Sequence, residues 1–335
     1  MKLTSLLAWF LGLLLAFRGS AADANFFGVI KLQQYAQSNA SAPIIASNGY
    51  SFQAFVNASA KFAITNATVK PGNSTPSRTL TPDSQGLIFR FEDNFPSQSA
   101  LDATYPNGTF LSPVNYTNTL FTIHDGIRSA TVNFFLLFVP LSYPATPQIQ
   151  NWPAAQAIDH TADFKLVWNN LGGSALAIVQ LLILDASSNV VFATPAPFQP
   201  GALDGSSTSA TVPALTLPPG ANLIAHLTIA NPGTPNTNSY PGAVGISALT
   251  KDNSFTLATR PAPVRPHLTV LPKASGNFAL RLEGETNRIY HLEATTDFLS
   301  WTNLITTNSD SGLFNHADPA SPTIPSRFYR GRVGQ

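Results

Sequence analysis

The chain has 335 residues, of which 44% are hydrophobic and only 10% are charged, and its formal net charge at pH 7 is +1. A typical soluble domain carries about 25% charged residues, so Ser, Thr, Asn, Pro and Gly replace much of the usual charge. This composition favours short strands joined by turns over helices. A chain so close to neutrality lacks the basic face that nucleic-acid binding requires, so we expect no nucleic-acid partner.

The first 22 residues have the features of a secretory signal peptide. Lys2 provides the positive charge, residues 6–17 form an uncharged apolar run, and small residues follow at positions 19–22. This run is shorter than the roughly 20 residues that a spanning helix needs, so cleavage is favoured over a membrane anchor. We therefore expect a secreted or cell-envelope protein with no membrane span after cleavage.

Alternating apolar residues predict strands along the first part of the chain. Residues 50–56 and 87–91 alternate with a period of two, as half-buried strands do. Apolar segments lie before and after His124-Asp125-Gly126, and Asp-Gly between two such segments is a strong hairpin signal. These elements indicate a first β-sandwich domain over residues 23–147.

The second part of the chain has a similar organisation. Phe164, Leu166 and Trp168 alternate with polar residues, and residues 175–184 form an apolar run that is typical of a central strand. We expect an immunoglobulin-like β-sandwich over residues 148–259, a usual size for such a domain. Further strands are expected at residues 190–193, 223–230 and 255–258.

A proline-rich linker and a small third domain follow. Three prolines within residues 260–267 predict a stiff, extended spacer, because proline cannot lie inside a sheet. The remainder, residues 268–335, is expected to be a small β-module with Trp301 as a core residue. Its strands are predicted at residues 268–271, 278–282, 290–294, 302–306, 313–315 and 328–333. The predicted fold class is all-β, with tandem immunoglobulin-like β-sandwiches plus a small C-terminal β-domain.

The C-terminal segment also carries a specific pattern. Its parts are Tyr290-His-Leu-Glu-Ala-Thr-Thr-Asp297, then Trp301, then Asp318-Pro319 and finally Arg327-Phe-Tyr-Arg330. This pattern resembles a C-terminal β-module of uncharacterised exported proteins from environmental bacteria, and the match covers about the last 50 residues. The resemblance implies export and a β-module, and it brings no catalytic residue with it.

Candidates for catalysis and metal binding are few. The sequence contains no Gly-x-Ser-x-Gly elbow, Walker A loop, dinucleotide-binding glycine pattern or His-Glu-x-x-His motif. The metal-binding candidates are Asp159, His160 and Asp185, in segments expected to be turns. Asp185 and Asn189 offer hard oxygen ligands within one turn, and such ligands suit Ca²⁺ better than a transition metal. We expect no other cofactor.

Candidates for ligand binding are aromatic residues in loop-like segments, because an exposed ring on a β-protein can stack on a sugar. An extracellular polysaccharide or a surface protein is therefore the expected partner. The four candidates are Tyr105, Tyr116, Trp152 and Tyr240.

These features favour a non-catalytic binding or scaffold protein of the extracellular space or envelope surface, with glycans as one class of ligand. Two alternatives remain open. A secreted hydrolase with an acidic or metal-assisted site requires His124, Asp159 or His160 to converge with other polar groups in one concavity. A structural surface-layer component requires self-assembly.

Overall fold

The structure is a computed structural model that describes residues 23–71, 76–106, 118–124, 129–135, 142–172, 176–197, 199–240, 242–262, 264–274, 277–324 and 326–334. Strands make up most of this part of the chain, with the two short helices α2 (Gln98–Thr104) and α3 (Trp152–Ala155). The predicted all-β class is confirmed. No described helix has the length and apolar character that crossing a membrane requires. The chain divides into two compact units, Met1–Arg260 and Pro261–Gln335.

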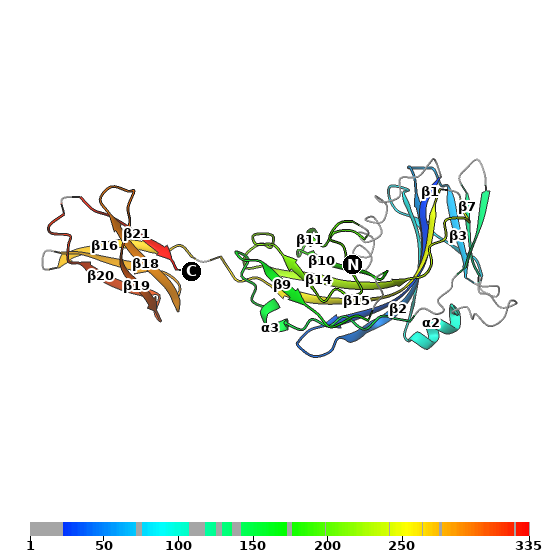
Figure 1. The fold of residues 1–335 in the computed structure, drawn as a ribbon, viewed down its shortest axis with the longest axis horizontal. Helices are drawn as coiled ribbons and strands as arrows, with labels where there is room; N and C mark the ends of the chain where they lie inside the picture. The colour runs from blue at the N-terminus through cyan, green and yellow to red at the C-terminus, as the bar shows by residue number, and fades with distance from the viewer. Residues whose placement is uncertain are drawn as a thin grey trace. The chain divides into compact units, whose positions relative to one another are not determined.

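A nine-stranded sheet runs through the first unit (Figure 1). Its strand order is β11-β10-β14-β15-β1-β2-β6-β5, and β12 pairs with β10 beside this path. The bounds are β1 (Ala24–Gln37), β2 (Ile44–Ala58), β5 (Thr81–Pro82), β6 (Ile88–Phe95), β10 (Ile178–Leu184), β11 (Val190–Ala193), β12 (Leu203–Asp204), β14 (Asn222–Pro232) and β15 (Val244–Ala258).

Two smaller sheets pack on one face of this large sheet, and each encloses an apolar core with it. The first has the order β4-β3-β7-β8, and the second pairs β13 with β9. Val29 of β1 contributes to the first core and Phe255 of β15 to the second. The strands of these two smaller sheets are β3 (Asn66–Pro71), β4 (Arg78–Thr79), β7 (Asn118–His124), β8 (Ser129–Phe135), β9 (Phe164–Val167) and β13 (Ser209–Val212).

The pairing of β1 with β15 joins the two sandwiches into one unit. The strands run parallel through twelve consecutive residue pairs, from Phe26–Val244 to Gln37–Phe255. The expected boundary between domains 23–147 and 148–259 therefore does not divide this unit. A strand from the first expected domain pairs along its length with the last strand of the second.

Buried polar groups separate the two cores on the shared face. Lys31 Nζ lies 2.5 Å from Asp102 Oδ1 of α2, and burial lowers the pKa of Lys31 while the hydrogen bond and charge of Asp102 oppose that effect. Gln37 Oε1 accepts from the backbone N of Ile149 at 2.8 Å and from Asn253 Nδ2 at 3.1 Å. These partners compensate the loss of water that burial causes.

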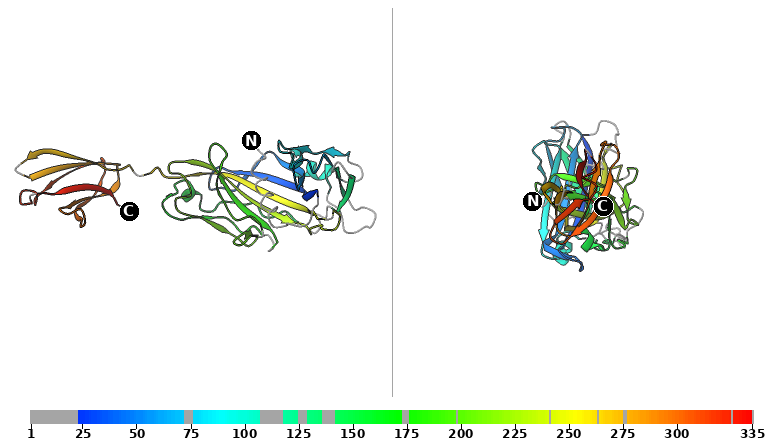
Figure 2. Two further views of the ribbon diagram at one scale, coloured as in Figure 1. Left: turned by 90° about the horizontal axis from the view of Figure 1, so that it is seen from above. Right: turned by 90° about the vertical axis from the view of Figure 1, so that its left-hand side faces the viewer.

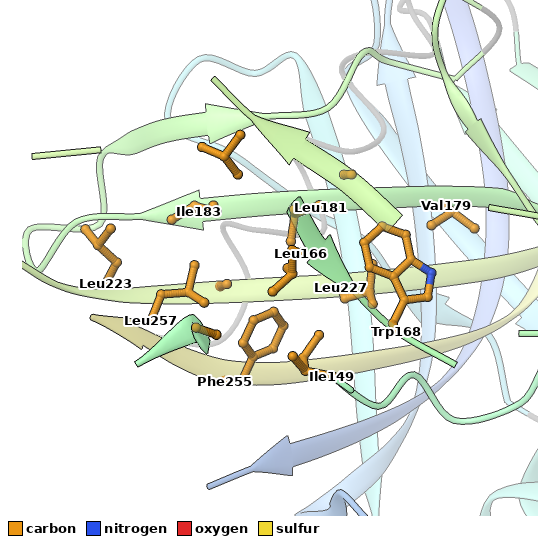
Figure 3. Close-up of a cluster of buried hydrophobic side chains, with 14 of the residues drawn as sticks. Ile149, Leu166, Trp168, Val179, Leu181, Ile183, Leu223, Leu227, Phe255 and Leu257 are labelled. Carbon is orange, nitrogen blue, oxygen red and sulfur yellow. The ribbon is translucent and has the colours of Figure 1, made fainter. Parts of the chain in front are cut away.

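A buried tryptophan forms part of the second core (Figure 3). Trp168 is buried, and its Nε1 donates to the carbonyl oxygen of Ser207 at 2.8 Å. Leu166 is also buried and Phe164 packs partly buried against the same core, so the predicted alternation at these positions is confirmed. Strand β10 is buried at every position, as predicted for a central strand.

The second unit is a sandwich of two three-stranded sheets (Figure 2), with orders β16-β17-β20 and β19-β18-β21. Leu280, Leu282, Tyr290 and Leu292 form its core. Trp301 was expected in this core but lies outside it, because it stacks against Arg330 on the outer side of the second sheet. The strands coincide with the six predicted segments: β16 (His267–Ala274), β17 (Asn277–Glu283), β18 (Arg288–Thr295), β19 (Thr302–Ser309), β20 (Leu313–Asp318) and β21 (Phe328–Val333).

Two glycine substitutions test the division into two units. A Cβ at Gly28 would lie 2.5 Å from the carbonyl oxygen of Ile246 and 2.8 Å from Cζ of Phe55, whereas a Cβ at Gly284 would meet the ring of Tyr290. We expect Gly28→Ala to lower the free energy of unfolding of the first unit alone, by about 1–3 kcal/mol, and Gly284→Ala to destabilise the module alone. Calorimetry measures both transitions. A shift of both transitions in either variant would contradict the division.

Candidate functional site

The aromatic candidates that the structure describes are buried. The ring of Tyr105 stacks on Phe52 with centroids 4.0 Å apart, and its hydroxyl donates to Asp93 Oδ2 at 2.9 Å. Burial raises the pKa of Tyr105, and the hydrogen bond to Asp93 adds to the rise. Trp152 and Tyr240 are also buried, each in one of the two cores. These three side chains pack the interior instead of offering a ring to a ligand, which corrects the interpretation from sequence.

The remaining aromatic candidate, Tyr116, lies outside the described residues.

The metal-binding candidates each belong to their own turn. Asp159 Oδ1 accepts from Oγ1 and the backbone N of Thr161, at 2.7 and 2.9 Å. Asp185 accepts from Nδ2 and the backbone N of Asn189, at 2.9 and 2.8 Å. These hydrogen bonds, led by those from the two side chains, lower the pKa of both carboxyl groups. Within the described ranges no three His, Asp or Glu side chains group as a metal site would, and this includes His160.

A buried polar cluster lies on the face of the large sheet opposite the two cores. Asp252 of β15 accepts from Thr228 Oγ1 at 2.6 Å and lies 3.0 Å from His226 Nδ1, both of β14. Burial acts to lower the pKa of His226, but the hydrogen bond and charge of Asp252 outweigh it and the pKa is raised. The hydroxyl donates to the carboxylate and not to the imidazole, so the cluster lacks the order of a nucleophilic triad.

An exposed candidate lies in the module, at the turn between β18 and β19. Asp297 Oδ1 accepts from the backbone N of Ser300 and of Leu299, both at 2.9 Å, and Thr295 Oγ1 accepts from the backbone N of Phe298 at 3.1 Å. The hydrogen bond from Ser300 is the largest of the contacts that lower the pKa of Asp297. Local bonds of this type fix the conformation of the turn.

The tip of this turn presents two apolar side chains to solvent. Phe298 has φ +58°, in the left-handed region that is strained for a bulky residue. Its side chain is nevertheless 58% exposed, and that of Leu299 is 87% exposed. Core packing therefore does not account for the strained conformation, and strain of this kind is often found at functional sites.

Two further aromatic rings lie beside Phe298. The ring of Phe298 lies 4.0 Å from that of Phe328, centroid to centroid, and 6.4 Å from that of Trp301. Phe328 is 41% exposed. We call these residues, Phe298, Leu299, Trp301 and Phe328, the apolar platform.

Beside the apolar platform, the outer face of the β19-β18-β21 sheet is polar. Glu293 Oε2 accepts from Arg330 Nε at 2.7 Å, and Glu293 Oε1 lies 3.3 Å from Arg332 Nη2. The guanidinium carbon of Arg330 also lies 3.9 Å from the ring centroid of Trp301. Alternate residues of a strand share one face, so Phe328, Arg330 and Arg332 form a row along this surface.

Sequence reasoning missed this site. It assigned Trp301 to the core and offered no residue of the segment 297–301 as a binding candidate. The sequence signal that was available is the run Asp297-Phe-Leu-Ser, in which two large apolar residues occupy a turn.

Comparisons with known proteins assign no function to the chain. No protein-family model matches it, and no curated protein sequence matches it. Among solved structures, it is similar to the FN1–FN3 domains of chicken CNTN1, with 8% identity, a TM-score of 0.23 and 88% of each chain covered. It is also similar to the BSP domain of a biofilm-associated protein, with 8% identity and a TM-score of 0.19, covering 97% of this chain and 66% of that one. A tandem repeat from the extending region of a large adhesion protein gives 11% identity and a TM-score of 0.20, covering 92% and 74%.

The His226–Asp252 pair predicts a pH dependence for the first unit. Because the pKa of His226 is raised on folding, its stabilising contribution is complete below the ordinary pKa of about 6.5 and is lost as the pH rises through the raised value. We expect the melting temperature of this unit to fall as the pH rises above about 6.5, and to fall less in His226→Gln. His160→Gln is the control. An equal fall in both variants would contradict the assignment.

Proposed function

We propose that this protein is an exported, non-catalytic binding protein of the extracellular space or cell envelope. In this proposal the first unit is a scaffold and the C-terminal module contacts the partner, for which a glycan is the favoured class. Export is supported by the leader-like residues 1–22 and by the resemblance of residues 290–330 to modules of exported proteins. The observation that carries the proposal is the apolar platform.

The apolar platform has the properties of a binding surface. Aromatic side chains in fixed positions lose little conformational freedom on binding, and they dominate the energetics of interfaces. Phe298 and Leu299 are held outward by the hydrogen bonds of Asp297 and Thr295, so a partner meets a preformed surface. Tyr105, Trp152 and Tyr240, the described aromatic candidates of the first unit, are by contrast part of its interior.

A glycan suits this surface because a sugar ring has both apolar and polar sides. Its C–H groups pack on aromatic rings, and its hydroxyl groups require hydrogen-bonding partners beside those rings. The outer face of the β19-β18-β21 sheet supplies such partners next to the apolar platform. They include His291, Asn303, Thr306 and Arg332.

The hydrolase alternative receives no support from the geometry. His124 ends β7, a strand of the first sandwich. Asp159 and His160 lie in the turn before β9, a strand of the second sandwich. The residues that would have to converge are therefore attached to different small sheets, and we do not propose this function.

The test is a binding screen of the intact protein against polysaccharides and surface proteins, with Ca²⁺ and with a chelator. We expect Phe298→Ala to weaken the binding that the screen finds by roughly tenfold, as the loss of one stacked ring contact predicts. Phe62→Ala is a matched control, because Phe62 also has a positive φ, +67°, and is 74% exposed, but lies in a turn of the first unit.

Binding that responds to Phe62→Ala and not to Phe298→Ala would contradict the role of the module. Binding that is lost with the chelator would instead assign the contact to an acidic turn such as that of Asp185. Self-assembly without any ligand would support the surface-layer alternative over the present proposal.

A further inference from the structure

We propose that the outer face of the β19-β18-β21 sheet binds an acidic polysaccharide, with sugar rings on the apolar platform and a uronate carboxylate on Arg332. This inference rests on the proposed function of the module as the binding part of the protein. It adds the charge class of the ligand and the direction in which the polysaccharide lies across the sheet.

The first argument is the charge of this face. Glu293 is the one carboxylate shared by Arg330 and Arg332, and its side chain is only 8% exposed. Two guanidinium groups against one carboxylate leave an excess of one positive charge at this end of the sheet. A ligand that carries carboxylates complements this charge, whereas a neutral polysaccharide does not.

The second argument separates the roles of the two arginines. Arg330 is held by two contacts of 2.7 Å to Glu293, through Nε and Nη2, and by its stack on Trp301. Arg332 has only a longer contact of 3.3 Å to Glu293, and its side chain is 56% exposed, against 45% for Arg330. Arg330 therefore orients the tryptophan ring, and Arg332 is the cation that an incoming carboxylate can reach.

The third argument is the spacing along the strand. Phe328 and Arg332 are four residues apart on one face of β21, which at about 3.3 Å per residue corresponds to about 13 Å. One sugar ring is too small to contact both ends, so the ligand is a chain.

Asp297 lies beyond Thr295, which pairs with Phe328 at the far end of this row. At physiological ionic strength, charges more than about 8 Å apart are largely screened, so Asp297 does not cancel the charge at Arg332.

The same observations disfavour other polyanions. Nucleic-acid binding requires several Lys or Arg contacts to phosphates, whereas this face offers two guanidinium groups, one of them held by Glu293 and Trp301. The titratable groups that face Arg332 are Glu293 and His291, and His291 pairs with Arg332 in register. One cation that is held only loosely by Glu293, beside a row of aromatic rings, fits a polymer that carries both sugar rings and carboxylates.

The experiment measures binding of the intact protein to three polymers by affinity electrophoresis and calorimetry. Polygalacturonate carries sugar rings and carboxylates, dextran carries sugar rings alone, and polyglutamate carries carboxylates alone. We expect binding to polygalacturonate that weakens with added salt, and at least tenfold weaker binding to each of the other two. Equal binding to dextran, or to polyglutamate, would overturn the proposal.

Paired variants locate the site. We expect Phe298→Ala to weaken binding to polygalacturonate roughly tenfold, and Arg332→Gln to weaken it roughly fivefold while reducing its salt dependence. The controls are Phe62→Ala and Arg281→Gln, which should change binding less than twofold. Arg281 lies on β17 of the other sheet of the module, where its Nε donates to Asn315 at 3.2 Å. An unchanged thermal transition of the module in each variant shows that folding is retained.

The outcomes separate this inference from the proposed function. If another ligand binds and is lost in Phe298→Ala but not in Arg332→Gln, the module is the binding unit and the acidic class is wrong. If polygalacturonate binds and neither variant weakens it, the site lies elsewhere and both proposals fail. Loss in both variants, with both controls unchanged, supports the acidic polysaccharide.

Discussion

The parallel pairing of β1 with β15 is the constraint on which the first unit depends. It joins Phe26 to Val244, residues 218 positions apart, and both strands are 14 or 15 residues long. Strands usually have 3–10 residues, and the extra length lets β15 serve both cores, with Leu249 in the first and Phe255 and Leu257 in the second. The first core combines residues 24–123 with Tyr240, Ala243 and Leu249, so it is complete only when both ends of this unit are present. Contacts so distant in sequence predict slow folding, and Gly28 of β1 leaves no space for a larger residue, because a Cβ there would meet the carbonyl oxygen of Ile246 on β15.

The same pairing explains why polar residues are buried in the middle of the sheet. The face of the large sheet that lines both cores is apolar at each core, and between the cores it carries Lys31 and Gln37. Removing Asp102 would take the paired carboxylate away from the buried ammonium group of Lys31, and breaking a buried ion pair in this way costs about 3–5 kcal/mol in other proteins. Gln37 ties the backbone of Ile149 to the sheet, so it positions the segment that leads into the second core. These polar contacts attach the covering elements at defined places.

Local patterns were sufficient to predict part of this architecture. The continuous apolar run of β10 and the six strands of the module were predicted from periodicity and turn residues alone. Strand β1 and the first part of β15 were missed, because Lys31 and Asp252 interrupt an apolar pattern whose partner is distant in sequence. The binding candidates failed for a related reason: Tyr105 occurs in a loop-like segment but packs on the end of a core. The exposure of Phe298 depends on a left-handed turn fixed by hydrogen bonds, which no periodicity reveals.

The final strand of the module combines inward packing contacts with outward residues to which we assign binding. Arg327 and Tyr329 both contact the buried carboxylate of Asp318, at 3.2 and 2.9 Å. Burial, together with the hydrogen bond to Asp318, raises the pKa of Tyr329 to about 12. These inward contacts explain the roles of the first and third residues of the segment Arg-Phe-Tyr-Arg. Phe328 and Arg330 point to the opposite face, where Phe328 remains 41% exposed. Because the contacts of Arg327 and Tyr329 with Asp318 already hold this strand in place, folding does not require the exposed ring of Phe328. That ring is better explained by a surface that another molecule covers.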